Sequence, residues 1–206
     1  MPLRRLTSES FRETQLAELA AWVPHVANKE HIRYELLEHS DVLAPFQEMF
    51  GNRQFRRGLD VGVGPYGLGF LGPHLRDQIE QIDGLDPLPL IGLTVKDGTL
   101  RDEICEIRRR VNYIQGRGED IPVRDGAYDI VACINVVDHA LHPDRIMAEI
   151  RRVLKPGGVF VFGVNSPWIK ARRDGAPMDG GNAADERSGP WASGVQPPAD
   201  RGLACT

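Results

Sequence analysis

The sequence predicts an α/β fold, a doubly wound parallel sheet of about five strands preceded by helices. Three observations support this class. Short apolar runs alternate with segments of helical periodicity. A cluster of glycines follows the first apolar run. Residues 128–135 are apolar almost throughout, as expected for a strand that is buried on both faces.

Three parts of the chain are predicted to differ in structure. Residues 1–50 carry apolar stripes at helical spacing, so we expect an N-terminal helical segment that forms a lid or cap. Residues 51–170 hold the alternating strands and helices of one ligand-binding domain. Residues 171–206 are rich in Gly, Pro and Ala and poor in large apolar side chains, so we expect a disordered tail.

The predicted strands cover residues 59–63, 78–85, 111–115, 128–135 and 159–164. Helices are predicted over residues 99–110 and 143–154, and Lys155–Gly158 is expected to end the second of them. A further helix is predicted to start near Gly67, but it is poorly specified because Gly72 and Pro73 interrupt it early.

The glycine cluster is the first candidate binding element. Gly62, Gly64 and Gly67 have G-x-G-x-x-G spacing, which lets a ligand lie against bare main chain beside a helix N-terminus. A nicotinamide or flavin dinucleotide site and a simple glycine-rich turn are the alternatives.

Polar residues follow the other predicted strands. Asp86 ends the second strand, 24 residues after the first glycine of the cluster, and its carboxylate can accept both hydroxyls of a ribose. The alternative is a turn-forming aspartate before a proline. Glu119 and Asp120 follow the third strand and Asn135 ends the fourth. Because parallel strands present their carboxyl ends at one edge, we expect these residues to converge on one cleft.

Composition argues against several classes of protein. The net charge of −4 offers no basic field for nucleic acid, and no apolar run is long enough to span a bilayer. The three cysteines are widely spaced and match no metal-binding pattern. No apolar segment stands behind Met1–Arg5, so we expect no secretory signal and a cytoplasmic location.

Taken in order, these residues resemble the class I S-adenosylmethionine-dependent methyltransferases, in the branch of small methyltransferase domains. Leu59–Gly64 is similar to the first motif of that family, L-D-x-G-x-G, and Leu85–Pro87 resembles the second. Gly118–Pro122 resembles the loop whose acidic residue holds the adenine amino group. Tyr128–His139 resembles the fourth motif, and Glu149–Gly158 resembles a segment that dinucleotide dehydrogenases lack.

The resemblance implies a Rossmann-like sheet, S-adenosyl-L-methionine as cofactor, and an enzyme that transfers a methyl group to a small molecule. It implies cofactor contacts for Asp60, Gly62, Gly64, Gly67, Asp86, Glu119, Asp120 and Asn135. No catalytic residue is assigned, because a general base is optional when the methyl donor is already activated. His139 is the candidate base, and a histidine at a surface turn is the alternative.

Two departures from the family pattern stand out. Tyr66 occupies the usual third glycine position, and Gly67 comes one residue later. After residues 159–164 the family sheet continues, whereas this chain enters its Gly/Pro/Ala-rich tail, so we expect an exposed fifth-strand edge that invites self-association. Two alternatives therefore stay open: a truncated, weakly active or inactive methyltransferase-like domain, and a nicotinamide-dependent oxidoreductase, which is disfavoured.

Overall fold

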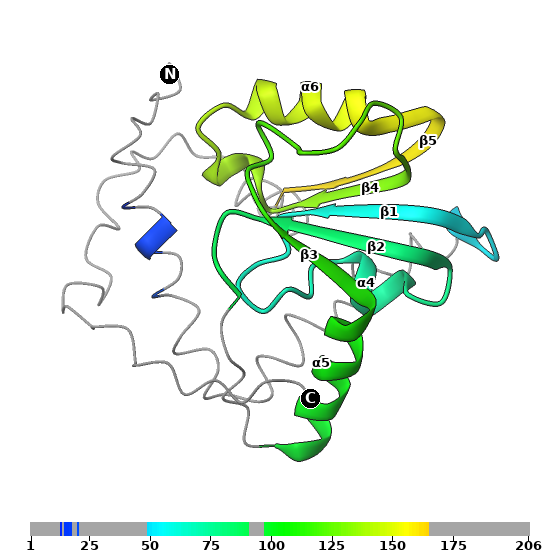
Figure 1. The fold of residues 1–206 in the computed structure, drawn as a ribbon, viewed down its shortest axis with the longest axis vertical. Coiled ribbons are helices and arrows are strands. Elements are labelled where there is room, and N and C mark those ends of the chain that lie inside the picture. Colours follow the sequence, from blue (N-terminus) through cyan, green and yellow to red (C-terminus); the bar gives the residue numbers. More distant parts are fainter. Residues whose placement is uncertain (1–12, 14, 18–19, 21–48, 91–96, 165–206) are drawn as a thin grey trace, which may run out of the picture.

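A computed structural model of the chain describes residues 49–90 and 97–164, together with 13, 15–17 and 20 (Figure 1). The predicted tail lies outside the described residues, and so does nearly all of the predicted N-terminal helical segment. The division of the chain into three parts therefore stays a prediction.

The described residues form a parallel sheet of five strands in the order β3-β2-β1-β4-β5. The strands are β1 (Phe55–Val61), β2 (Ile79–Asp86), β3 (Val111–Gln115), β4 (Tyr128–Ile134) and β5 (Leu154–Gly163). The strand order reverses between β1 and β4, which is the position where ligands bind in open α/β sheets. The predicted parallel sheet is confirmed.

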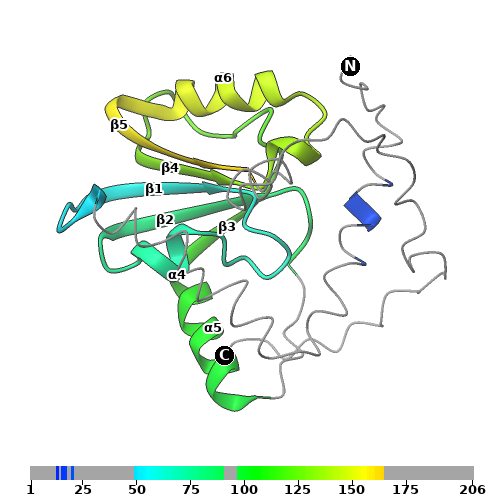
Figure 2. The same ribbon diagram turned by 180° about the vertical axis from the view of Figure 1, so that it is seen from behind.

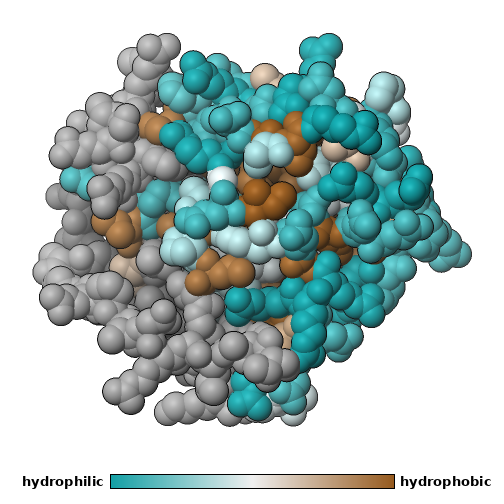
Figure 3. Space-filling model, in the orientation of Figure 1, coloured by the Kyte–Doolittle hydropathy of each residue, from teal (hydrophilic) through white to brown (hydrophobic). Residues whose placement is uncertain are grey.

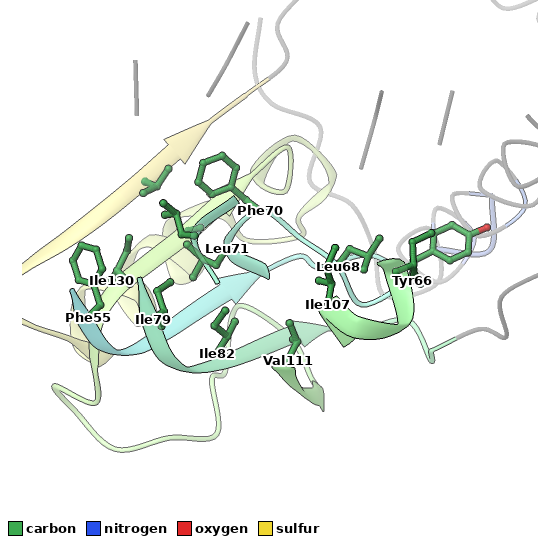
Figure 4. Packing of buried hydrophobic residues seen from close by; sticks show 14 of the residues in the cluster. Phe55, Tyr66, Leu68, Phe70, Leu71, Ile79, Ile82, Ile107, Val111 and Ile130 are labelled. Atoms are coloured by element: carbon green, nitrogen blue, oxygen red, sulfur yellow. The ribbon is translucent and has the colours of Figure 1, made fainter. Parts of the chain in front are cut away.

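Helices lie on both faces of this sheet (Figures 1 and 2). They are α4 (Leu71–Leu75), α5 (Gly98–Arg110) and α6 (Pro143–Val153), with a short 3-10 helix, η1 (Val137–His139), after β4. One apolar cluster packs α4 and α5 against the sheet, with Leu71, Ile107 and Ile130 fully buried (Figure 4). A second cluster packs Ile146 and Ile150 of α6 against the opposite face.

Several predicted boundaries differ from the structure, most of all at β1, α4 and β5. β1 covers residues 55–61 rather than 59–63, because Phe55 and Arg57 already pair with β2. The helix after the glycine cluster begins at Leu71 and not near Gly67, because residues 64–67 form turns. Pro73 lies in the first turn of α4, where its missing N–H has no helical partner to lose. Lys155–Gly158 belongs to β5, which starts directly after α6 and shifts register against β4 in this stretch.

A polar cluster around Asp83 joins four neighbouring strands. The buried Asp83 carboxylate of β2 accepts hydrogen bonds from Arg57 Nη2 (2.6 Å), Asn112 Nδ2 (2.8 Å) and Tyr128 Oη (2.9 Å). Burial, followed by the contact with Asp83, raises the pKa of the Tyr128 hydroxyl. Because breaking a buried ionic contact is costly, this cluster fixes β1, β2, β3 and β4 beside one another.

Candidate functional site

The glycine turn at the carboxyl end of β1 depends on left-handed backbone. Gly62, Gly64, Gly67 and Gly69 have φ values of +83°, +69°, +67° and +56°. A β-carbon on Gly62 would lie 2.2 Å from Val136 Cγ2, a residue that follows β4. The turn therefore requires glycine for its conformation and packs directly against the chain beyond β4. The structure adds Gly69 to the three glycines that the spacing predicted.

Asp60 lies beneath this turn. Its side chain is only 2% exposed, and Oδ2 accepts hydrogen bonds from the N–H groups of Phe70 (2.5 Å) and Leu71 (2.7 Å). Burial raises the pKa of the Asp60 carboxyl to about 7, against the lowering effect of the two backbone hydrogen bonds. The carboxylate of β1 thus caps the N-terminal end of α4 and holds the turn in place. A direct cofactor contact by Asp60 stays a prediction.

Asp86 connects the tip of β2 to the glycine turn. Its Oδ2 accepts the Gly64 N–H at 2.8 Å and its Oδ1 accepts the Leu88 N–H at 2.9 Å. A carboxylate can accept about four hydrogen bonds, so these two contacts do not by themselves exclude a ribose diol. Asp86 is only 6% exposed, which means that a ligand must displace covering groups to reach it. The chemistry of the residue fits the nucleoside part of the implied cofactor.

Tyr113 of β3 holds the segment that follows Asp86. Its hydroxyl donates to the carbonyl oxygen of Leu88 and lies 3.4 Å from the Asp86 carbonyl oxygen. Burial, and then the charge of Asp86, raise the pKa of this phenol. Tyr113 therefore remains a neutral hydrogen-bond donor beside the carboxylate. No motif in the sequence pointed to it.

The loop between β3 and β4 reaches the same edge of the sheet. The Gly116 N–H donates to the Asp86 carbonyl oxygen at 2.9 Å. A β-carbon on Gly118 would lie 3.2 Å from Val61 Cγ1 at the end of β1. Of the two candidate acids, Asp120 is exposed, whereas the Glu119 side chain is 8% exposed and lies 3.3 Å from Arg117 Nη2. The structure thus brings this loop beside Asp86, as the strand order predicted.

The segment after β4 completes the edge. Asn135 is exposed and has a φ of +55°, a value that asparagine tolerates better than most residues. Its N–H donates to the Gly163 carbonyl oxygen at 2.8 Å, and the next residue contacts the glycine turn. His139 ends η1, but its side chain is outside the described part of the structure. Its role stays a prediction.

A groove of about 710 Å³ lies elsewhere on the molecule, between α6 and the first half of β5. Met147, Arg151 and Phe160 are among its lining residues. Seen from the side of Figure 1, apolar residues also reach the surface near the middle of the described part, with hydrophilic residues around them (Figure 3). Within the described residues there is no cluster of metal ligands, and no helix is long and apolar enough to cross a membrane.

A parallel sheet with a glycine turn at its switch point, and an acidic residue tied to that turn, defines an α/β protein with a nucleoside-type binding edge. Residues 59–162 match the family model of the methyltransferase domain. The chain belongs to this family, the class I S-adenosylmethionine-dependent methyltransferases.

Several curated and solved proteins are similar to this chain. Thiol S-methyltransferase TMT1A of Homo sapiens is 26% identical over 68% of this chain and 57% of its own length. An uncharacterized methyltransferase of Mycobacteroides abscessus is 30% identical over 78% of this chain and 57% of its own length. The chain thus spans little more than half the length of these relatives. The crystal structure of the N-methyltransferase NodS of Bradyrhizobium japonicum, in complex with S-adenosyl-L-homocysteine, matches 77% of this chain and 78% of its own, with a TM-score of 0.54 and 13% identity.

Proposed function

We propose that this protein is an S-adenosylmethionine-dependent methyltransferase that acts on a small molecule. The observation that carries the proposal is the 2.8 Å hydrogen bond between Asp86 and the Gly64 N–H at the switch point of the sheet. In a chain of the methyltransferase-domain family, this contact supports a nucleoside cofactor at the edge where Gly62, Asp86 and Asn135 lie.

Each element of the edge has a role in this proposal. The glycine turn admits the cofactor close to the main chain, and Asp86 accepts the ribose hydroxyls. Glu119 or Asp120 accepts the adenine amino group. Bound S-adenosylmethionine supplies a methyl group that its sulfonium charge already activates. The protein's task is then to exclude water and to align the acceptor, for which Asn135 and the segment after it are placed beside the turn.

Binding experiments test the proposal directly. We expect titration calorimetry to detect binding of S-adenosyl-L-homocysteine and no binding of NAD. Binding of NAD without a response to S-adenosylhomocysteine would overturn the assignment in favour of an oxidoreductase. Binding without methyl transfer would support the alternative of an inactive domain. Since the named relatives act on different acceptor atoms, sulfur in one and nitrogen in another, the transfer assay includes both thiols and amines.

Asp86→Ala is expected to weaken binding of S-adenosylhomocysteine by about ten- to a hundred-fold. The reason is the loss of a hydrogen bond between a carboxylate and hydroxyl groups, which contributes about 1.5–3 kcal/mol. Calorimetry measures the loss, and Asp102→Ala on the exposed face of α5 is the matched control. An unchanged dissociation constant in Asp86→Ala would return this residue to the role of a turn former.

Two further proposals concern self-association of the protein and its location in the cell. Within the described residues β5 is hydrogen-bonded to β4 alone, and Phe162 of β5 is 46% exposed. These observations support self-association through the β5 edge. A cytoplasmic location, without nucleic-acid or membrane partners, agrees with the composition of the sequence.

A further inference from the structure

Residues 116–127 join β3 to β4 without forming a helix or a strand. Their internal backbone hydrogen bonds are short-range ones, from Asp120 N to Arg117 O (3.1 Å) and from Val123 N to Ile121 O (2.7 Å). A loop of this kind needs contacts from elsewhere to adopt one conformation. Besides the burial of Ile121 and Ala127 in the core, two side chains of α6 supply such contacts.

Glu149 and Arg152 bind the backbone of the loop directly. Glu149 Oε2 accepts the Ile121 N–H at 2.9 Å, and Arg152 Nη2 donates to the Ile121 carbonyl oxygen at 2.9 Å. Arg152 Nη1 donates to the Val123 carbonyl oxygen at 2.7 Å and to Asp125 Oδ1 at 2.9 Å. Both peptide groups of Ile121 are therefore held from α6, including the one that it shares with Asp120.

The two side chains also bind each other. Arg152 Nε lies 2.8 Å from Glu149 Oε1, and Arg152 Nη2 lies 2.6 Å from Glu149 Oε2. The hydrogen bonds from Arg152 hold the pKa of Glu149 below its usual value, and the carboxylates of Glu149 and Asp125 raise the pKa of Arg152. The five contacts of this guanidinium match its five N–H donors in their fixed planar arrangement, which a lysine does not reproduce.

We propose that Glu149 and Arg152 are positioning residues for the base of the cofactor. They fix the peptide groups on both sides of Ile121, and so fix where the acids at positions 119 and 120 stand relative to Asp86. The loop is held at its other end by the bond from Gly116 N to Asp86 O (2.9 Å). This inference rests on the proposed function, since it needs an adenine at that edge.

Base selectivity is the property that separates this role from a merely stabilising one. The probes are S-adenosyl-L-homocysteine and its deaminated analogue, in which hypoxanthine replaces adenine and the amino donor is lost. The wild-type chain is expected to prefer the adenine compound by about tenfold, the typical effect of one hydrogen bond to a charged group. In Arg152→Lys and Glu149→Gln this preference is expected to fall to about twofold or less, with the larger loss on the adenine compound.

Arg151→Lys is the matched control, because Arg151 lies on the same helix and no hydrogen bond joins it to residues 116–127 in the described structure. It is expected to keep the wild-type preference. Melting temperatures of all variants, measured without ligand, show which of them fold. If Arg152→Lys does not fold, Glu149→Gln provides the test of base selectivity.

The outcomes distinguish the proposed function from the positioning role of Glu149 and Arg152. A wild-type chain that binds neither compound overturns the proposed function and the positioning role together. A wild-type chain that binds both compounds equally overturns the positioning role alone. The same holds if the preference survives in both variants while their melting temperatures fall, because Glu149 and Arg152 then only stabilise the fold.

Discussion

Gly69→Ala is expected to remove roughly 3–5 kcal/mol from the free energy of unfolding. The backbone at Gly69 has a φ of +56°, and a β-carbon there would lie 2.3 Å from Asp60 Oδ2 and 2.8 Å from Val63 Cγ1. The Asp60 carboxylate cannot move away easily, because it is buried and accepts hydrogen bonds from two backbone N–H groups. The loss is a large share of the stability of an ordinary domain. Urea unfolding followed by circular dichroism measures it.

Gly126→Ala is the matched control for the backbone. Gly126 has a φ of +57°, but no atom lies within 4 Å of the position of an added β-carbon. Gly126→Ala is therefore expected to lose only the cost of an alanine in left-handed backbone, about 1–2 kcal/mol, without a steric clash of the added β-carbon. Equal losses in the two variants would mean that the collision with Asp60 is relieved without cost, contrary to this expectation.

At pH 4.5, where the Asp60 carboxyl is protonated in the folded chain, Asp60→Ala is expected to destabilise the protein by roughly 2–6 kcal/mol. The substitution leaves the N–H groups of Phe70 and Leu71 buried without their acceptor, and each such group costs about 1–3 kcal/mol. The effect on cofactor binding is expected to follow, because α4 and the glycine turn lose their common support. Urea unfolding measures the stability, and Asp77→Ala, a substitution of an exposed carboxylate, is the control. A stability equal to that of the wild-type chain would disprove the capping role.

The Asp60 carboxyl also makes stability depend on pH. Burial raises its pKa from 3.8 to about 7 in the folded chain. Between these values the unfolded chain has lost this proton while the folded chain retains it, so stability falls as the pH rises. The contribution is fully present below pH 3.8 and is lost as the pH rises through about 7, and its size is on the order of 4 kcal/mol.

Asp60→Asn removes this titration while it keeps an oxygen that can accept the two N–H groups. The difference in unfolding free energy between the wild-type chain and Asp60→Asn is therefore expected to shift in favour of the variant from pH 4.5 to pH 7.5, by about 3 kcal/mol. Urea unfolding at the two pH values measures the shift. Parallel pH profiles would show that the Asp60 pKa is ordinary in the folded state.

Much of the sheet could be predicted because turn residues bound its apolar segments, most clearly at β4, which is apolar almost throughout. β3 has the predicted bounds, α5 begins one residue before its predicted start, and β2 is displaced by one residue at both ends. β1 begins at Phe55, four residues before its predicted start. The start of α4 could not be predicted, since its capping group, Asp60, comes from the preceding strand and not from the residue before the helix. The start of β5 at Leu154 could not be predicted either, because it also depends on a contact with a distant part of the chain. A Lys-Pro-Gly-Gly stretch reads as a helix stop, yet pairing with β4 draws its flanks into the sheet.

In the candidate site, the spacing of residues along the sequence predicted those positions whose role depends on backbone conformation or on the order of the strands. It selected three of the four left-handed glycines in the turn, and also Asp86, whose place follows from strand order. It missed Tyr113 and the pair of Glu149 and Arg152, which act on backbone groups far away in the sequence. Such contacts leave no local pattern. Glu149 and Arg152 do lie in the segment that resembles the family, Glu149–Gly158, but their i, i+3 spacing reads equally well as a solvated surface pair.

The polar cluster of Arg57, Asp83, Asn112 and Tyr128 has a practical consequence for laboratory evolution. It ties four strands together through side chains that lie within the strands and not in the loops after them. Libraries that randomise the segment after β4 to change the accepted substrate can therefore leave this anchor untouched. Variants selected from them are expected to differ in specificity more than in the temperature at which they unfold, so that new activities can be sought without first adding stabilising substitutions.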